Sequence, residues 1–214
     1  AGCYFAHLAY ASGAKVFLFD HQAPKDKACG GGITAKAILE FPFLEQLSCP
    51  HISIKEAVFI SPYDLSVQIK LDYPVLIFSR IDLNRALLSM AVSGGVTFLK
   101  QQVLDFQELG TGWQIVTSRE TLQADILVGA DGINGVTRRK FIGALPQSST
   151  MIGTGYYLES FAEKSITIKL LPDLPGYIWV FPGPSYTSIG LGLPLGCLKS
   201  KNMLQRIKAF MEVP

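Results

Sequence analysis

A cysteine followed by three glycines is the most distinctive chemical feature of the sequence. The segment from Pro24 to Gly32 reads Pro-Lys-Asp-Lys-Ala-Cys-Gly-Gly-Gly. Consecutive glycines cost backbone entropy and offer no side chain to a core, so they suit a place where main chain passes close to a flat ligand. The alternative is a flexible loop, although such loops seldom need a cysteine and a fixed proline beside their glycines. We therefore expect Cys29 to lie beside a ligand.

The first twenty residues fit the second half of a dinucleotide-binding unit. Gly2 opens a helix, and Asp20 closes the following strand eighteen residues later. These positions match the last glycine and the acidic residue of a GxGxxG fingerprint, whose carboxylate binds the ribose hydroxyls of an adenosine. The first two glycines are not present, and the same residues also suit helix packing and a strand-end cap.

Asp131 and Gly132 follow an apolar segment, Leu122 to Ala130, and precede a short basic helix around Arg138. We expect a strand over 122–130 that delivers a carboxylate and a permissive glycine to the start of a helix, where phosphate groups bind well. An ordinary glycine-rich turn between strand and helix is the alternative.

Aromatic residues alternate along a later segment. Tyr177, Trp179 and Phe181 fall on one face of a strand, where they line either a cavity for an apolar chain or the core.

The elements that must position these residues alternate between helix and strand and then become a β meander. Helical spacing predicts helices over 1–12, 34–39, 80–92, 138–140 and 198–211. Apolar and β-branched runs predict strands over 15–20, 56–61, 65–79, 96–106, 113–117, 122–130, 151–159, 165–171, 177–181 and 185–193. The fold class is therefore α/β, a dinucleotide-binding domain interleaved with an antiparallel substrate sheet.

Composition narrows the class of protein. The chain is 49% hydrophobic and 17% charged with a net charge of +2, which indicates a globular protein that does not bind nucleic acid. Its four cysteines lack metal-ligand spacing, so we expect free thiols in a reducing compartment and no metal site. The three histidines are scattered, which argues against a Ser-His-Asp triad.

The cysteine and glycine segment resembles the signature loop of the geranylgeranyl reductase family of FAD-dependent oxidoreductases, within the flavin hydroxylase superfamily. Pro175 to Pro182, Pro-Gly-Tyr-Ile-Trp-Val-Phe-Pro, resembles another reductase motif. Arg80 to Asn84 is similar to the family's Arg-x-x-Leu-Asp, with Asn84 for the usual aspartate. Val128 to Arg138 is similar to the superfamily's second flavin motif, with Gly135 for the usual serine.

The resemblance implies a Rossmann-like FAD-binding domain (1–45 and 80–146) interleaved with an antiparallel β-sheet substrate domain (46–79 and 147–214). It implies hydride transfer from reduced FAD to isolated double bonds of a geranylgeranyl (prenyl) lipid, with Cys29 as the flavin-side catalytic candidate. It also implies a substrate cavity lined by Tyr177, Trp179 and Phe181. The implied FAD-binding residues are Gly2, Asp20, Lys27, Gly30, Gly31, Gly32, Arg80, Asp131, Gly132 and Arg138.

The start at Ala1 inside a helix, and the lack of a third flavin motif before Pro214, favour a fragment without its first strand and C-terminal part. The expected partner is a prenyl lipid or a prenylated small molecule, and NADPH, ferredoxin or another electron-donor protein would supply electrons. We expect a cytoplasmic location and leave peripheral membrane contact open. Two alternatives also stay open: a flavin-dependent monooxygenase or halogenase, and a flavin-less remnant that binds prenyl chains.

Overall fold

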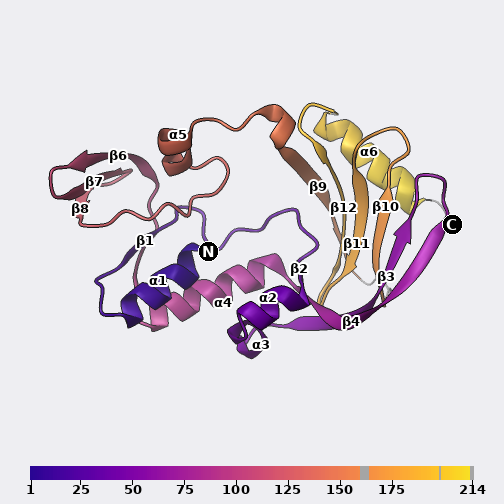
Figure 1. The fold of residues 1–214 in the computed structure, drawn as a ribbon, viewed down its shortest axis with the longest axis horizontal. Coiled ribbons are helices and arrows are strands. Elements are labelled where there is room, and N and C mark those ends of the chain that lie inside the picture. The colour runs from indigo at the N-terminus through magenta and orange to yellow at the C-terminus, as the bar shows by residue number, and fades with distance from the viewer. Residues whose placement is uncertain (160–163, 198, 213–214) are drawn as a thin grey trace. The chain divides into compact units, whose positions relative to one another are not determined.

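The computed structural model describes residues 1–159, 164–197 and 199–212 (Figure 1). The chain forms two compact units, each built from two segments of sequence. Unit 1 comprises Ala1–Lys25 and Asn84–Leu145, and unit 2 comprises Asp26–Leu83 and Pro146–Pro214. The mixed α/β fold with several sheets agrees with the predicted fold class.

Unit 1 is organised around a short parallel pair of strands. β1 (Phe17–Phe19) pairs with β5 (Thr97–Leu99), and Phe17 lies opposite Thr97. The helix α1 (Gly2–Ala11) packs on them together with α4 (Arg80–Ser93), most of which belongs to this unit. Ala6, Ala91 and Val96 are buried together in this core, because their small side chains let the elements approach closely.

The rest of unit 1 is an antiparallel sheet and a short helix. The sheet has the order β6 (Val103–Leu109), β7 (Gly112–Thr117), β8 (Thr121–Ala124), and the helix is α5 (Val136–Ile142). The prediction of one strand over 96–106 was wrong, because the chain turns between β5 and β6. The Gln101 N–H donates to the Leu99 carbonyl at 2.8 Å, and the buried Gln101 amide bonds with Thr117 and Glu120.

The predicted strand over 122–130 was also wrong beyond Ala124. β8 ends there, and residues 125–130 pair with no other strand in the part of the chain that the structure describes. The side chain of Ile126 is 77% exposed and that of Val128 is 47% exposed. An apolar pattern predicts where a strand can form, but a strand requires a hydrogen-bonded neighbour.

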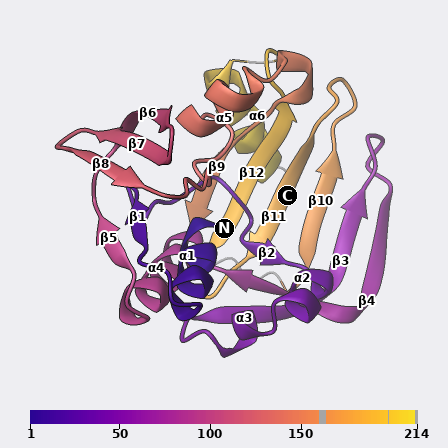
Figure 2. The ribbon, with the colours of Figure 1, turned by 60° about the vertical axis from the view of Figure 1, so that its left-hand side comes forward.

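Unit 2 is built on one seven-stranded sheet (Figures 1 and 2). Its order is β2 (Gly32–Ile33), β4 (Ser66–Phe78), β3 (His51–Ile60), β10 (Ile166–Leu170), β11 (Tyr177–Pro182), β12 (Thr187–Pro194), β9 (Met151–Leu158). Every neighbouring pair is antiparallel except β3 and β10, which join the two segments of the unit in parallel. A three-residue 3-10 helix, η1 (Gln147–Ser149), precedes β9.

Two short helices, α2 (Ala35–Glu40) and α3 (Phe43–Gln46), follow β2. Thr34 is the N-cap residue of α2, but its side chain makes no capping hydrogen bond. The resemblance placed residues 26–45, and also 80–83, in the first domain, whereas the structure groups them with unit 2. The reason is the antiparallel pairing of Gly32 with Ile77 and of Ile33 with Leu76.

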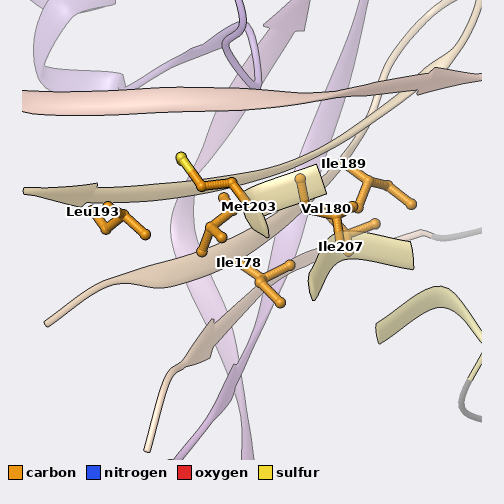
Figure 3. Close-up of a cluster of buried hydrophobic side chains, with 7 residues drawn as sticks. Ile178, Val180, Ile189, Leu193, Met203 and Ile207 are labelled. Carbon is orange, nitrogen blue, oxygen red and sulfur yellow. The ribbon is translucent and has the colours of Figure 1, made fainter. Parts of the chain in front are cut away.

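The main core of unit 2 lies between this sheet and α6 (Ser200–Met211). Ile178 and Val180 of β11, with Ile189, Leu191 and Leu193 of β12, pack against Met203 and Ile207 of α6 (Figure 3). The sequence predicted this helix as amphipathic over 198–211, and residue 198 lies outside the described residues. Among the described residues, no helix is long and apolar enough to cross a membrane.

Replacing Ile207 by alanine is expected to lower the free energy of unfolding by about 2–5 kcal/mol, because it opens a cavity in this core. Urea unfolding followed by circular dichroism measures the change. Gln205→Ala, at an exposed position of the same helix, is the control and should change stability by less than about 0.5 kcal/mol. Equal stability of the two variants would show that α6 does not contribute to the core as described.

Candidate functional site

The three glycines of the cysteine segment lie directly against the sheet of unit 2. Gly31 has a φ of +77°, and a Cβ there would come within 2.0 Å of the Phe78 carbonyl oxygen. The Phe78 N–H donates to the Gly31 carbonyl at 3.1 Å, next to the β2 and β4 pairing. A Cβ on Gly30 or Gly32 would collide with the ring of Phe181, at 2.3 and 2.9 Å. The glycines therefore let main chain approach the protein's own strands, a neighbour that the sequence did not predict.

Cys29 is held through its main chain. The Ser188 hydroxyl donates to the Cys29 carbonyl at 3.1 Å, and the Trp179 indole N–H donates to that hydroxyl at 3.1 Å. The Cys29 thiol is half-buried, and its sulfur accepts the Gly31 N–H at 3.4 Å. The structure thus links two sequence-predicted residues, Cys29 and Trp179, through Ser188, which no motif had indicated.

The indole of Trp179 packs against residues without side chains. A Cβ on Gly190 would come within 2.0 Å of the indole, and one on Gly153 within 3.4 Å. The signal for this arrangement is present in β12, whose sequence alternates small residues (Ser188, Gly190, Gly192) with large ones (Ile189, Leu191, Leu193). The small residues fall on the Trp179 face and the large ones on the α6 face.

An open cavity of about 290 Å³ adjoins Trp179. Its walls are the loop residues Asp26–Ala28, the β9 residues Thr154–Tyr157, Trp179 and Ser188. This volume is near the lower end of ligand pockets. Of the three aromatic residues predicted to line a substrate cavity, Trp179 lines this one. Phe181 packs beneath the glycines, and Tyr177 packs beside Trp179 with ring centroids 6.3 Å apart.

Tyr157 is a cavity residue that sequence reasoning missed. Its hydroxyl donates to the Lys27 carbonyl at 2.8 Å, and Asp26 Oδ1 lies 3.2 Å away. Burial, followed by the negative charge of Asp26, raises the pKa of the Tyr157 hydroxyl. The hydroxyl therefore remains a hydrogen-bond donor at neutral pH. Lys27 is exposed, and its ammonium has no hydrogen-bond partner among the residues the structure describes.

In unit 1 the structure brings Gly2 close to the Asp131 segment. A Cβ on Gly2 would lie 3.3 Å from the Cβ of Ala130 and 3.7 Å from Leu18 of β1. Asp20 follows β1, and its Oδ1 accepts the N–H groups of Gln22 and Ala23 at 2.8 and 3.1 Å. Oδ2 of Asp20 receives no hydrogen bond from the described residues, so one oxygen is available to a ligand.

Asp131 is engaged with the first turn of α5. Its carboxylate accepts the Thr137 N–H at 2.9 Å and also bonds the Thr137 hydroxyl. Gly132 has a φ of +78° with no described atom within 4 Å of a built Cβ, so its surroundings are open. Arg138 donates from Nη1 to the Gly143 carbonyl at the end of the same helix.

Arg80 carries a buried donor without an acceptor. Its Nε has no hydrogen-bond partner among the described residues, and it lies in the first turn of α4 directly after the buried Ser79. An unsatisfied buried donor costs about 1–3 kcal/mol, so an acceptor supplied by a ligand would be stabilising. At the motif position where aspartate is usual, the Asn84 amide donates to the Lys25 carbonyl at 2.6 Å. An ionised aspartate could not make that bond.

The predicted site residues thus form two groups, each described within its own unit. Gly2, Asp20, Asp131, Gly132 and Arg138 lie in unit 1. The residues in unit 2 are Lys27, Cys29, Gly30, Gly31, Gly32, Arg80, Tyr177, Trp179 and Phe181.

Comparison with known proteins follows this geometry. No protein-family model matches the chain. It is 28% identical over 201 residues to an uncharacterised protein of Methanosarcina barkeri. The alignment covers 89% of this chain and 50% of that protein. It is 29% identical over 214 residues to the menaquinone reductase of Mycolicibacterium smegmatis. That alignment covers 90% of this chain and 52% of that enzyme. The chain spans about half the length of these curated relatives.

Solved structures share the fold. A geranylgeranyl bacteriochlorophyll reductase-like protein from Thermoplasma acidophilum superposes with a TM-score of 0.81 at 18% identity, over 99% of this chain and 58% of that one. The halogenase PltM, in complex with phloroglucinol and FAD, superposes with a TM-score of 0.74 at 16% identity, over 99% and 55%. The chain therefore has a fold that reductase-like proteins and halogenases share.

Replacing Gly31 by alanine is expected to destabilise unit 2 by about 1–3 kcal/mol more than replacing Gly13, because only Gly31 faces a backbone collision. Gly13→Ala is the matched control, since Gly13 has a φ of +91° with nothing within 4 Å of a built Cβ. That control should cost about 1–2 kcal/mol for the left-handed backbone alone. Chemical denaturation measures both, and equal losses would contradict the close approach of Gly31 to Phe78.

Proposed function

We propose that the protein to which this chain belongs is an FAD-dependent reductase that hydrogenates isolated double bonds of a geranylgeranyl or other prenyl lipid chain. The observation that carries the proposal is the arrangement on one face of the unit 2 sheet, where the Cys29 segment, the Trp179 indole and the cavity adjoin. Two similar proteins are named for menaquinone and for geranylgeranyl bacteriochlorophyll. Both molecules carry a polyisoprenoid chain, which supports this substrate class.

Several residues have the unused bonding capacity that FAD requires. Oδ2 of Asp20 suits a ribose hydroxyl, the open surroundings of Gly132 suit close approach of a phosphate or ribityl group, and Nε of Arg80 suits an acceptor on the flavin. The set that we assign to cofactor binding is completed by Gly2, Lys27, Gly30, Gly31, Gly32, Asp131 and Arg138. The residues fit FAD, although the Asp131 carboxylate is already engaged with Thr137.

Reduced FAD, when bound, supplies hydride to one carbon of the double bond, and a proton must reach the other carbon. The chain's own contribution is to orient the lipid and to keep water away. The indole of Trp179 gives the cavity an apolar wall, and Tyr157 and Ser188 hold the loop that forms the opposite wall. NADPH, ferredoxin or an electron-donor protein would reduce the flavin.

The second candidate is a flavin-dependent monooxygenase or halogenase. The observation in its favour is the fold shared with PltM over 99% of this chain. The cysteine and glycine segment and the Trp179 strand favour the reductase. Reactivity with oxygen distinguishes the two, because a monooxygenase or halogenase consumes oxygen and a prenyl reductase does not require it.

The decisive measurement uses the full-length protein encoded by the gene. Incubated without oxygen with chemically reduced FAD and a geranylgeranylated lipid, it is expected to yield lipid that gains two hydrogen atoms for each reduced double bond, detected by mass spectrometry. An unchanged lipid together with rapid oxygen consumption by the bound flavin would overturn the proposal in favour of the monooxygenase or halogenase. An unchanged lipid without flavin binding would favour a prenyl-binding protein.

Replacing Arg80 by alanine is expected to weaken FAD binding about 10- to 100-fold, since a hydrogen bond to a charged group contributes about 1.5–3 kcal/mol. Titration of FAD fluorescence measures the affinity. Stability to urea should not fall, because Nε has no acceptor in the described protein. Lys36→Ala, which removes an exposed positive charge from the same unit, is the control. Unchanged affinity in the Arg80 variant, or an equal loss in the control, would remove Arg80 from the flavin site.

A further inference from the structure

The loop from Asp26 to Gly32 is bound to the sheet through every second carbonyl. The carbonyl of Lys27 accepts the Tyr157 hydroxyl at 2.8 Å, that of Cys29 accepts the Ser188 hydroxyl at 3.1 Å, and that of Gly31 accepts the Phe78 N–H at 3.1 Å. Two side-chain hydroxyls therefore bind the loop that leads into the β2 and β4 pairing.

The two hydroxyls stand side by side. Tyr157 of β9 and Ser188 of β12 are directly opposite in the antiparallel pairing, so their side chains lie on the same face of the sheet. That face also carries Trp179, which bonds to Ser188. β9 and β12 are at the far end of the sheet from β2 and β4, so these two hydroxyls bind the loop to strands that the β2 and β4 pairing does not include.

We propose that Tyr157 is a positioning residue that fixes the main chain of Lys27 in the wall of the cavity and thereby positions Cys29, two residues further along the same loop, with Ser188 as its partner on the next strand. Any effect of Tyr157 on the rate of lipid reduction rests on the proposed reductase function. The fixing of the loop does not, because every contact that carries it lies within unit 2.

The contacts of Tyr157 explain why it suits this role. Its ring packs against Tyr186 with centroids 4.4 Å apart, which fixes the direction of the hydroxyl. Asp26 Oδ1 accepts the Lys27 N–H at 2.8 Å and lies 3.2 Å from the same hydroxyl, so one carboxylate orients both partners. Burial and the charge of Asp26 raise the pKa of Tyr157, and the O–H donor persists at neutral and mildly basic pH.

The test follows the accessibility of the Cys29 thiol in the flavin-free chain. Alkylation by iodoacetamide is measured for each cysteine by peptide mass spectrometry. Tyr157→Phe is expected to raise the Cys29 rate about threefold to tenfold, the effect of losing one hydrogen bond from a closed loop. Cys197, which is exposed, should react at the wild-type rate in every variant and serves as the internal standard.

Tyr186→Phe is the matched control, because Tyr186 contacts the same ring but makes no hydrogen bond to the loop among the described residues. It should leave the Cys29 rate within about twofold of wild type, as expected when no hydrogen bond is lost. Ser188→Ala tests the neighbouring contact and should also raise the rate. An unchanged Cys29 rate in Tyr157→Phe would overturn the proposal, whatever the rate in Ser188→Ala. Alkylation rates measured across pH separate a change in the accessibility of the Cys29 thiol from a change in its ionisation.

In the full-length protein with FAD, Tyr157→Phe should lower kcat with little change in KM for the lipid, because it misplaces a wall of the cavity rather than removing a lipid contact. If kcat is unchanged while the Cys29 rate rises, the positioning of the loop stands and its link to the reaction is refuted. If wild type reduces no lipid but the alkylation result holds, the proposed function fails and the positioning role of Tyr157 survives.

Discussion

The organisation of unit 2 depends on the close approach of the Gly30–Gly32 main chain to the strands of its sheet. The Gly31 carbonyl accepts the Phe78 N–H, and the backbone of Gly31 is in a left-handed conformation. A Cβ at this position would collide with the Phe78 carbonyl oxygen, so no other residue fits there without movement of β4. The ring of Phe181, on β11, fills the space beside Gly30 and Gly32. The Ser188 hydroxyl then binds the Cys29 carbonyl, and the Tyr157 hydroxyl binds the carbonyl of Lys27 two residues earlier.

The same sheet serves a second purpose on its other face. The alternation in β12 gives one side to the indole of Trp179 and the other to the branched side chains that pack on α6. Because successive residues of a strand point to opposite faces, the tightness of the α6 core and the fit of the indole are two consequences of one eight-residue segment. A shift of its register by one residue would place Ile189 and Leu191 where Ser188 and Gly190 now lie, and would destroy both.

Local patterns predicted the elements well and their neighbours poorly. The strands of the meander and helix α6 follow from alternation and helical spacing, which are properties of a short segment. The strand expected over 122–130 ends at Ala124, because its extension needs a partner that no local pattern specifies. The role of Tyr157 depends on a contact across 130 residues of sequence, and nothing in the β9 sequence marks it. The glycines were recognised as a place of close approach, but the sequence could not say to what.

Gly135 stands where the similar flavin motif has serine, and this difference explains the orientation of the Asp131 carboxylate. A Cβ on Gly135 would lie 1.9 Å from the Asp131 carboxyl carbon, so a serine there would push the carboxylate away from its present position. With glycine, the carboxylate turns inward and bonds to both the main chain and the side chain of Thr137. Asp131 therefore stabilises the start of α5, and the space beside the main chain of Gly132 is open. In the proposed flavin site, main chain, more than the Asp131 side chain, would therefore be the surface that this segment offers to the cofactor.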